Sequence, residues 1–334
     1  MRPLRVYLLA LLLLAGIWLS GASVSDSFRD CRQFFYMRAA PTGIDGTRDS
    51  LKRICQRYGD KARYATLYDG SRRLPLYSAY TFKKNDGKKR MDTPWMYEPQ
   101  LVSGNEGGNM KVLPPSDDPE PLIQESQAVL EDYSDAVEYS RGLLNPDQHQ
   151  ADPDDKASTY TLTNVVPQAV LADYSDAVVY ERGQLNPDQH QASPGDKAST
   201  YTLTNVVPQA KEFLHHHWLP YLEGIRKRLN NYCRGTAYII SGVTTTGNTI
   251  RRGNVNRVGV PKHLWIAYCC PDFDLSAPYE LRYKFPTYAA YGLNDVVDNA
   301  VTETSTKSVE ALVNREMAVD QDFQLFNGNC VPEV

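Results

Sequence analysis

The sequence lacks three features, and each absence narrows the function. After residue 22 there is no run of about 18 apolar residues, so no helical membrane span is expected there. The six cysteines form no CxxC pair, which argues against a zinc site. A large excess of charge of one sign is also missing, since the net charge is only −4. Without Arg2 and Arg5, 34 basic residues face 40 acidic ones, which argues mildly against a general polyanion binder.

The first 22 residues have the pattern of a secretory signal peptide. Arg2 and Arg5 precede an almost unbroken apolar run, Val6–Ile17, and Ser20-Gly21-Ala22 supplies small residues for cleavage. A retained signal anchor is the alternative, although the apolar run is short for a membrane span. We therefore expect residues 23–334 to be exported as one soluble, extracellular domain.

The cysteine count fits export. All six cysteines follow the cleavage site, and an even number in an oxidising compartment predicts disulfides. Fifteen pairings are possible for six cysteines. Cys269 and Cys270 are adjacent and are not expected to pair with each other. A bond from Cys31 to Cys330, which would tie the two ends of the domain together, is a guess.

An internal repeat is the most informative feature of the chain. Residues 127–167 and 168–208 align at an offset of 41 and differ at only six positions. Solenoid repeats are usually more numerous and more divergent, so a recent duplication of one segment explains the pattern better. An artefact of sequence assembly is the alternative.

The second copy predicts a strand, a loop and a strand. Residues 176–183 and 199–207 are rich in β-branched residues and alternate in polarity. The stretch between them, NPDQHQASPGDK, has the composition of turns. Similar patterns predict strands at 236–243 and 263–270, and a hairpin over 63–82 around Asp69-Gly70-Ser71.

A helix is predicted directly after the second copy, because apolar residues recur on one helical face. They are Phe213, Leu214, Trp218, Tyr221, Leu222, Ile225 and Leu229. A second helical pattern lies within 291–314, through Val296, Val297, Ala300 and Val301. Antiparallel strands with segregated helices indicate an α+β fold.

Basic residues gather in three places. They are Lys83, Lys84, Lys88, Lys89 and Arg90; Arg226, Lys227, Arg228 and Arg234; and Arg251, Arg252 and Arg257. These clusters predict either a local basic groove or solvated loops, and composition alone does not separate the two.

Four segments together carry a family resemblance. They are ICQRYGDKARYATLYDGSRRLPLYSAY (54–80), ERGQLNP followed by TLTNVVPQ, the tryptophan-containing helix, and AYGLNDVVDNAVTE (290–303). With them the chain resembles the DNA/RNA non-specific endonuclease family, and within it a secreted branch. The resemblance implies a ββα-metal core on a mixed, largely antiparallel sheet. It also implies one divalent cation, Mg²⁺ or Mn²⁺, and DNA or RNA as the substrate.

The family motif implies the catalytic positions. Phosphodiester hydrolysis needs a base, a cation and positive charge at the phosphate. The family's Asp-Arg-Gly-His supplies its base through the histidine, and here the motif is Glu181-Arg182-Gly183-Gln184. The base position therefore holds Gln184, which cannot accept a proton near neutral pH. Arg182 and Arg226 match the family's phosphate-facing arginines, and Glu181 is expected to orient Arg182.

The family's metal ligand is an asparagine four residues before the tryptophan. Counting back from Trp218 gives Leu214, so this ligand is replaced by an apolar side chain. The helix acid expected four residues after Trp218 falls on Leu222, with Glu223 beside it. His215, next to the vacant position, is either a substitute ligand or base or part of a polar flank of the helix.

Other polar residues near the motif have two interpretations each. His190 either folds back as a substitute base or caps its loop. Asn186 either reaches the phosphate or caps the turn. Asn205 is a possible metal ligand, although a hydrogen bond at the strand end is favoured.

The first copy carries Ser140-Arg141-Gly142-Leu143 and lacks a following helix, so the second copy is the better candidate site. Two functions follow from these substitutions. One is a metal-dependent endonuclease weakened at its base and metal ligand. The other is an inactive pseudoenzyme that binds nucleic acid or a protein partner in the same groove.

Overall fold

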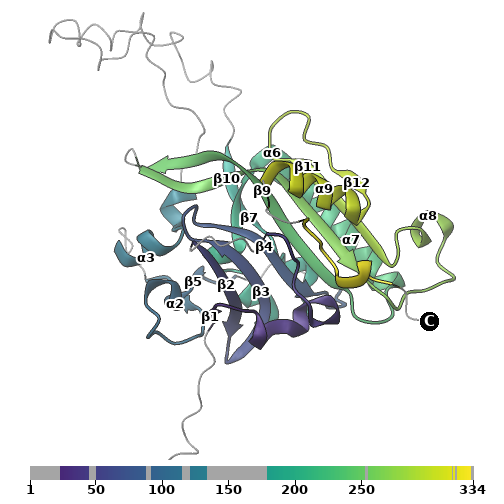
Figure 1. Cartoon of the computed structure of the whole chain (residues 1–334), viewed down its shortest axis with the longest axis horizontal. Coiled ribbons are helices and arrows are strands. Elements are labelled where there is room, and N and C mark those ends of the chain that lie inside the picture. The colour runs from purple at the N-terminus through teal and green to yellow at the C-terminus, as the bar shows by residue number, and fades with distance from the viewer. Residues whose placement is uncertain are drawn as a thin grey trace, which may run out of the picture.

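The computed structural model describes residues 23–44, 50–87, 92–114, 121–133, 179–252, 255–317, 319 and 322–331. Eight strands form one antiparallel sheet in the order β1-β2-β3-β4-β9-β10-β11-β12 (Figure 1). Their bounds are β1 Val24–Ser25, β2 Leu51–Tyr58, β3 Lys61–Asp69, β4 Leu74–Thr81, β9 Tyr238–Arg252, β10 Val255–Cys269, β11 Thr287–Leu293 and β12 Thr302–Thr304. The helices stand apart from these strands in the chain, which confirms the α+β class.

The hairpin predicted around Asp69-Gly70-Ser71 is confirmed as β3 and β4. Asp69 fixes its turn, because Oδ1 accepts from the backbone N–H of Ser71 at 2.9 Å and Oδ2 accepts from Arg72 at 2.7 Å. The strands predicted at 236–243 and 263–270 are also confirmed, as parts of the longer β9 and β10.

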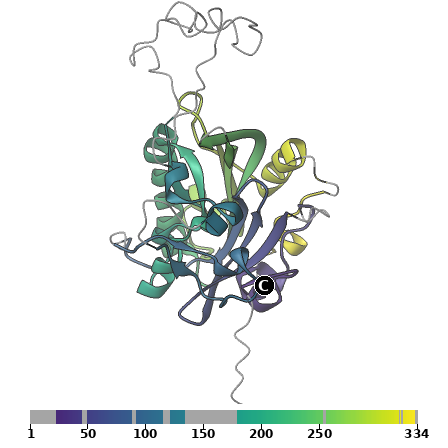
Figure 2. The ribbon, with the colours of Figure 1, turned by 90° about the vertical axis from the view of Figure 1, so that its left-hand side faces the viewer.

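Each face of the sheet has its own hydrophobic core, because successive strand residues point to opposite faces. On one face, Tyr80, Ile239, Leu264 and Tyr268 pack against the helix that contains Trp218. On the other, Tyr77, Trp265 and Ala267 pack against the N-terminal segment and α9 (Thr306–Met317). Figure 2 shows the sheet between these two layers.

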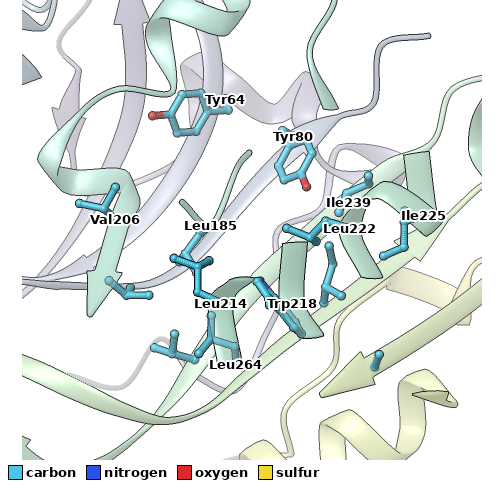
Figure 3. Close-up of a cluster of buried hydrophobic side chains, with 14 of the residues drawn as sticks. Tyr64, Tyr80, Leu185, Val206, Leu214, Trp218, Leu222, Ile225, Ile239 and Leu264 are labelled. Atoms are coloured by element: carbon cyan, nitrogen blue, oxygen red, sulfur yellow. The ribbon is translucent and has the colours of Figure 1, made fainter. Parts of the chain in front are cut away.

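The second copy leads into a ββα unit on the first face. β7 (Tyr180–Gln184) pairs antiparallel with β8 (Val206–Ala210) as a separate two-stranded sheet. The helix follows at once as α6 (Lys211–Phe213), a π-helical turn η8 (Leu214–Trp218) and α7 (Leu219–Tyr232). Figure 3 shows Leu185, Val206, Leu214 and Trp218 of this unit in the core. The predicted helix and ββα centre are therefore confirmed.

Short elements complete the described part of the chain. They are η1 Arg29–Phe34, η2 Tyr36–Arg38, β5 Met96–Tyr97, α2 Pro99–Val102, β6 Lys111–Val112, α3 Pro121–Ser126, η3 Leu130–Tyr133, η6 Asp188–His190, α5 Pro194–Ser199, η7 Leu203–Asn205, α8 Tyr279–Arg282 and η9 Asn327–Asn329. No helix in the described ranges is long and apolar enough to cross a membrane.

Two predicted elements are wrong. The strand expected at 199–207 begins only at Val206. The turn-like stretch before it forms α5, since Ser193 caps the helix by accepting from the backbone N–H of Asp196 at 3.0 Å and Pro194 starts its first turn. The residues after that helix continue as a turn at Thr200, an isolated bridge from Thr202 to Met96 and then η7.

The helix expected through Val296 and Val301 is also wrong, since the helix begins at Thr306. Asp295 and Asn299 divert the backbone locally. The carboxylate of Asp295 accepts from the N–H of Val296 at 2.7 Å, and Asn299 donates to the carbonyl of Asp295 at 2.8 Å. Such side-chain bonds compete with helix formation.

The predicted disulfides form, but the guess that paired Cys31 with Cys330 is wrong. The bonds are Cys31–Cys55, Cys233–Cys270 and Cys269–Cys330. Cys269 and Cys270 point to opposite faces at the end of β10, so their bonds join different cores. Cys31 instead lies above β2, where it reaches Cys55.

Gly242 of β9 gives a stability prediction. A Cβ there would lie 2.3 Å from Trp265 and 2.5 Å from the carbonyl of Leu76. We expect Gly242→Ala to lower the free energy of unfolding by about 1–3 kcal/mol, because the packed core must shift. Gly104→Ala is the control, since nothing lies within 4 Å of its Cβ position. Equal urea midpoints for the two variants, with disulfides intact, would contradict this.

Candidate active site

The ββα unit forms two cavities that share three residues, Arg182, Gln184 and Leu214. The first, of about 340 Å³, is also lined by Trp95, Tyr133, Glu181 and Tyr201. The second, of about 190 Å³, has an apolar wall of Trp218, Leu219 and Leu222. The predicted base and metal positions are thus brought to one place.

Gln184, at the base position, is held by its amide. The NH₂ group donates to the carbonyl and hydroxyl of Thr200 at 3.1 and 3.0 Å, and the amide oxygen accepts from the N–H of Asp188 at 3.3 Å. These bonds tie the end of β7 to the end of α5. The side chain therefore has a structural role and no capacity to accept a proton.

Leu214, at the metal position, is 3% exposed and packs in the first core. It brings no donor atom to a cation. Among the described residues no group of three His, Cys, Asp or Glu side chains is placed to hold a metal ion. The residues present therefore do not fit the divalent cation that the family resemblance implies.

Glu181 and His215 meet at the rim of the first cavity. His215 Nε2 lies 2.7 Å from the carboxylate of Glu181, and Lys211 Nζ lies 3.9 Å from the same group. Glu181 was expected to orient Arg182, but its hydrogen bond goes to the imidazole on the facing helix instead. His215 approaches the site as predicted, paired with this acid.

Arg182 lies in both cavities with its guanidinium 5.0 Å from the ring centre of Trp95. Burial lowers the pKa of Arg182, opposed by nearby Tyr133 and Glu181. No described residue forms a hydrogen bond or ion pair with its guanidinium. The buried hydroxyl of Tyr133, in the same cavity, also has no hydrogen-bond partner among the described residues. The site therefore offers unsatisfied donors to an anion.

Trp95, Tyr133 and Tyr201 were missed by sequence reasoning. They come from separate segments, and no periodicity links them to the motif. The WMYEP stretch around Trp95 was the available signal, since it combines aromatic residues with a following proline.

Arg226 was expected to face the phosphate, and the structure places it elsewhere. Its guanidinium forms two bonds of 2.6 Å with Glu223 and a third of 2.9 Å with the carbonyl of Asn85. The arginine is buried against Gly87, whose absent side chain leaves room for it. Both Arg226 and Glu223 thus fasten the 83–87 segment to α7 and have no free group for a phosphate or metal.

Asn205 and Asn186 are buried and hydrogen-bonded to the protein. Asn205 accepts from Ser78 and from the N–H of Asn186, both at 3.0 Å, and donates to the carbonyls of Asn186 and Thr200. The Asn186 side chain accepts from Gln191 at 3.0 Å. These contacts favour turn capping for Asn186 and a hydrogen-bonding role at the strand end for Asn205 over a phosphate or metal role.

His190 is completely buried outside the two cavities. Its Nε2 lies 2.9 Å from the carbonyl of Leu222, which can only accept, so Nε2 carries the proton. Nδ1 then accepts from the hydroxyl of Tyr80 at 2.9 Å. Burial lowers the pKa of His190 to about 4. The side chain therefore joins α7 to β4; it neither caps its own loop nor lines the cavities as a substitute base would.

The basic clusters do not form a free groove in the described part. Three of the predicted arginines are neutralised by carboxylates: Arg228 by Glu303 at 2.7 Å, Arg234 by Asp274 at 2.8 Å and Arg257 by Asp132 at 2.9 Å. Lys83 and Lys84 remain exposed beside the second cavity's Gly87 segment. Lys88, Lys89 and Arg90, and the first-copy residues Ser140, Arg141 and Leu143, lie outside the described residues.

Comparison with protein families decides the relationship. The model of the DNA/RNA non-specific endonuclease family matches residues 50–171 and 169–314. This chain belongs to that family. The two matched segments overlap at 169–171, next to the junction of the two repeat copies, so each segment contains one copy.

Curated relatives agree with the family. The chain is similar to the human endonuclease domain-containing 1 protein, at 32% identity over 166 residues, covering 47% of this chain and 31% of the relative. The mouse protein of that name is 28% identical over 156 residues, covering 42% and 27%. The matches thus span less than a third of these relatives. A solved EndoG/EndoGI complex aligns over 85% of this chain and 89% of its own at 13% identity and a TM-score of 0.41.

The buried imidazole gives a pH prediction. Because the pKa of His190 is lowered to about 4, the unfolded chain binds more protons between about pH 4 and 6.5. The free energy of unfolding should therefore fall as the pH drops through this window, by about 3 kcal/mol from this group.

His190→Gln should remove that share of the pH dependence. The exposed His216, paired with Glu212, gives the control His216→Gln, which should leave it unchanged. Urea unfolding of all three proteins at pH 7 and pH 4.5 measures the difference. An unchanged pH dependence in His190→Gln would contradict a buried neutral imidazole.

Proposed function

We propose that this chain is an exported endonuclease-family protein that binds nucleic acid at the Arg182 cavities and has lost most or all hydrolytic chemistry. The observation that carries the proposal is that Gln184 and Leu214 line the same cavities. One stands at the position of the base and the other at the position of the metal ligand. Loss of a general base alone removes about 10²- to 10⁴-fold in rate.

The first cavity suits a nucleotide without a metal. The guanidinium of Arg182 offers donors to a phosphate oxygen. Trp95 and Tyr201 offer aromatic faces, and base stacking on such faces tolerates any sequence. Glu181 contributes negative charge at the rim, but His215 and Lys211 lie beside it and offset that charge.

A weakly active enzyme is the second candidate. The specific observation is the 2.7 Å contact of Glu181 with His215, which brings a carboxylate and an imidazole to the cavity rim. A protein partner in the same groove is the alternative ligand. Export is supported by the three disulfides, which form in oxidising compartments.

Cleavage of plasmid DNA and of RNA tests the loss of chemistry. With Mg²⁺ or Mn²⁺, we expect no cleavage above background from the unmodified protein or from Gln184→His alone. The pair Gln184→His with Leu214→Asn should gain cation-dependent cleavage, because it returns a base and a metal ligand to one place.

Two results would count against this proposal. Cleavage by the unmodified protein that disappears with a chelator would favour the weak enzyme and direct attention to His215. If a double variant shown to be folded gave no cleavage, catalysis would need more than these two side chains.

Binding of single-stranded DNA tests whether the Arg182 cavities bind nucleic acid. Arg182→Gln should weaken binding roughly tenfold and reduce the slope of log affinity against log salt by about one, because one phosphate contact is lost. Arg282→Gln, an exposed change on α8, is the matched control. Equal affinities for the two variants, or no salt-dependent binding by the unmodified protein, would favour a protein partner.

A further inference from the structure

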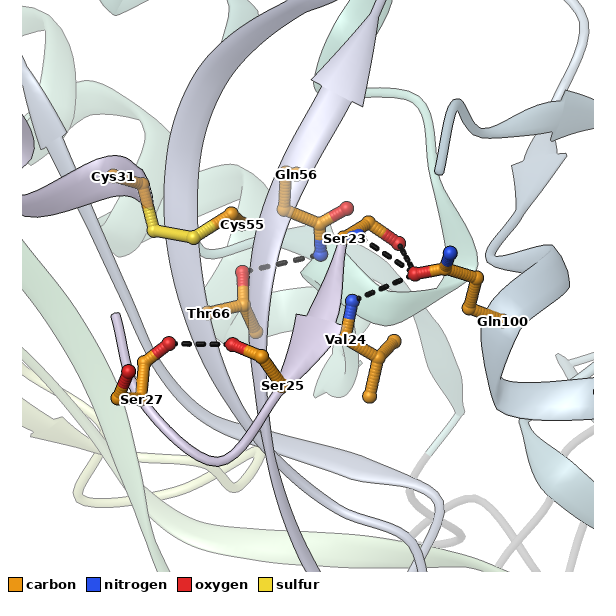
Figure 4. Close-up of a disulfide and its surroundings, with 9 residues drawn as sticks. All are labelled: Ser23, Val24, Ser25, Ser27, Cys31, Cys55, Gln56, Thr66 and Gln100. Atoms are coloured by element: carbon orange, nitrogen blue, oxygen red, sulfur yellow. Dashed lines mark hydrogen bonds between the residues drawn. A yellow bond between two sulfur atoms is a disulfide. The ribbon is translucent and has the colours of Figure 1, made fainter. Parts of the chain in front are cut away.

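The first residue described by the structure is buried and hydrogen-bonded at its backbone nitrogen. Ser23 is 0% exposed, and its N lies 2.6 Å from Oε1 of Gln100 (Figure 4). Its hydroxyl lies 3.1 Å from the same oxygen and 3.1 Å from Oε2 of Glu98. The chain thus enters the fold with its nitrogen bound to an amide oxygen and the hydroxyl of the same residue bound to a carboxylate.

Glu98 is a buried acid without a cation. It is 0% exposed, no described Lys, Arg or His side chain forms an ion pair with it, and its Oε1 has no hydrogen-bond partner among the described residues. Burial raises the pKa of Glu98 to about 8, and the hydroxyl of Ser23 opposes that rise. Without a cation the buried acid is therefore neutral near pH 7, and a positive charge beside it would let it ionise.

We propose that removal of residues 1–22 creates that charge: the new α-ammonium group of Ser23 pairs with Glu98 and Gln100 inside the fold. This rests on the proposed export of the chain. A signal peptidase would hydrolyse the peptide bond between Ala22 and Ser23, consuming one water. Ala22 leaves with the new carboxylate, and Ser23 keeps the nitrogen, which is protonated near neutral pH. The ammonium has three donors where the peptide nitrogen had one.

The pair reaches the walls of the first cavity. Glu98 follows Trp95 by three residues, and its backbone N–H and carbonyl are bound by the amide of Gln127 at 3.0 and 3.1 Å. Gln127 leads into η3, which carries Tyr133. Processing therefore fixes the two segments that supply Trp95 and Tyr133 to the proposed binding site.

The pH dependence of stability differs before and after cleavage. Uncleaved, Glu98 has a raised pKa, so the free energy of unfolding falls as the pH rises from about 4.5 to 8. Tyr64 on β3 is the titratable neighbour of Glu98, and it stays neutral in this range because burial raises its pKa well above the usual value. After cleavage, the ammonium group of Ser23 lowers the pKa of Glu98. The fall in the free energy of unfolding with rising pH then disappears.

A four-protein comparison tests the pair. One chain starts at Ser23, and the other retains Ala22 so that the amino group moves out by one residue. Each is made unmodified and with Glu98→Gln, and melting is measured at pH 7. The Ser23 start should melt roughly 5–10 °C higher in the unmodified pair, and Glu98→Gln should abolish that difference. Equal melting of the two unmodified chains, or a difference that survives Glu98→Gln, overturns the inference.

N-terminal sequencing of the protein from secreting cells separates this inference from the proposed function. A start at Ser23 supports it. A chain that keeps residues 1–22 overturns the cleavage and this inference together. A start at Ser23 without a Glu98-dependent melting shift overturns the pair alone and leaves the nucleic-acid proposal standing.

Discussion

The candidate site depends on the side-chain amide of Asn205. This one buried group uses all its hydrogen-bonding capacity, joining Ser78 of β4 to Asn186 after β7 and to Thr200 after α5. Losing it would leave several buried partners unsatisfied, at about 1–3 kcal/mol each. Because the ββ pair forms its own small sheet, this amide holds the pair against the main sheet. The amide of Asn205 thereby helps to position the cavities around Arg182.

Local sequence signals predicted the fold correctly where side-chain bonds and the polarity pattern favour the same backbone structure. The Asp69 turn and the apolar face from Phe213 to Leu229 needed nothing distant. Prediction failed where a short polar side chain redirects the backbone. Ser193 starts a helix inside a stretch that reads as turns, and Asp295 and Asn299 stop one inside an apolar pattern. In both places a single side-chain hydrogen bond outweighs periodicity over several residues.

For the site, spacing identified the positions but not the partners. The family motif identified Gln184 and Leu214 as site positions, and in the structure both line the same cavities. Motif spacing predicted that Arg226 faces the phosphate, because spacing carries no information about tertiary contacts. In the structure, Glu223 and Asn85 bind that guanidinium instead. Trp95 and Tyr133 could not be predicted as site residues for the same reason. They belong to the site only through tertiary packing, and nothing in their neighbourhoods along the chain points to Arg182.

The hydrogen bonds of Gln184 have an evolutionary consequence. The amide makes three contacts that a histidine ring in the same place would not reproduce. Replacing Gln184 by the histidine of the family motif would therefore cost stability at once. It would return little rate while position 214 remains leucine. Two changes that are each unfavourable alone therefore separate the present sequence from one with histidine at position 184 and asparagine at position 214.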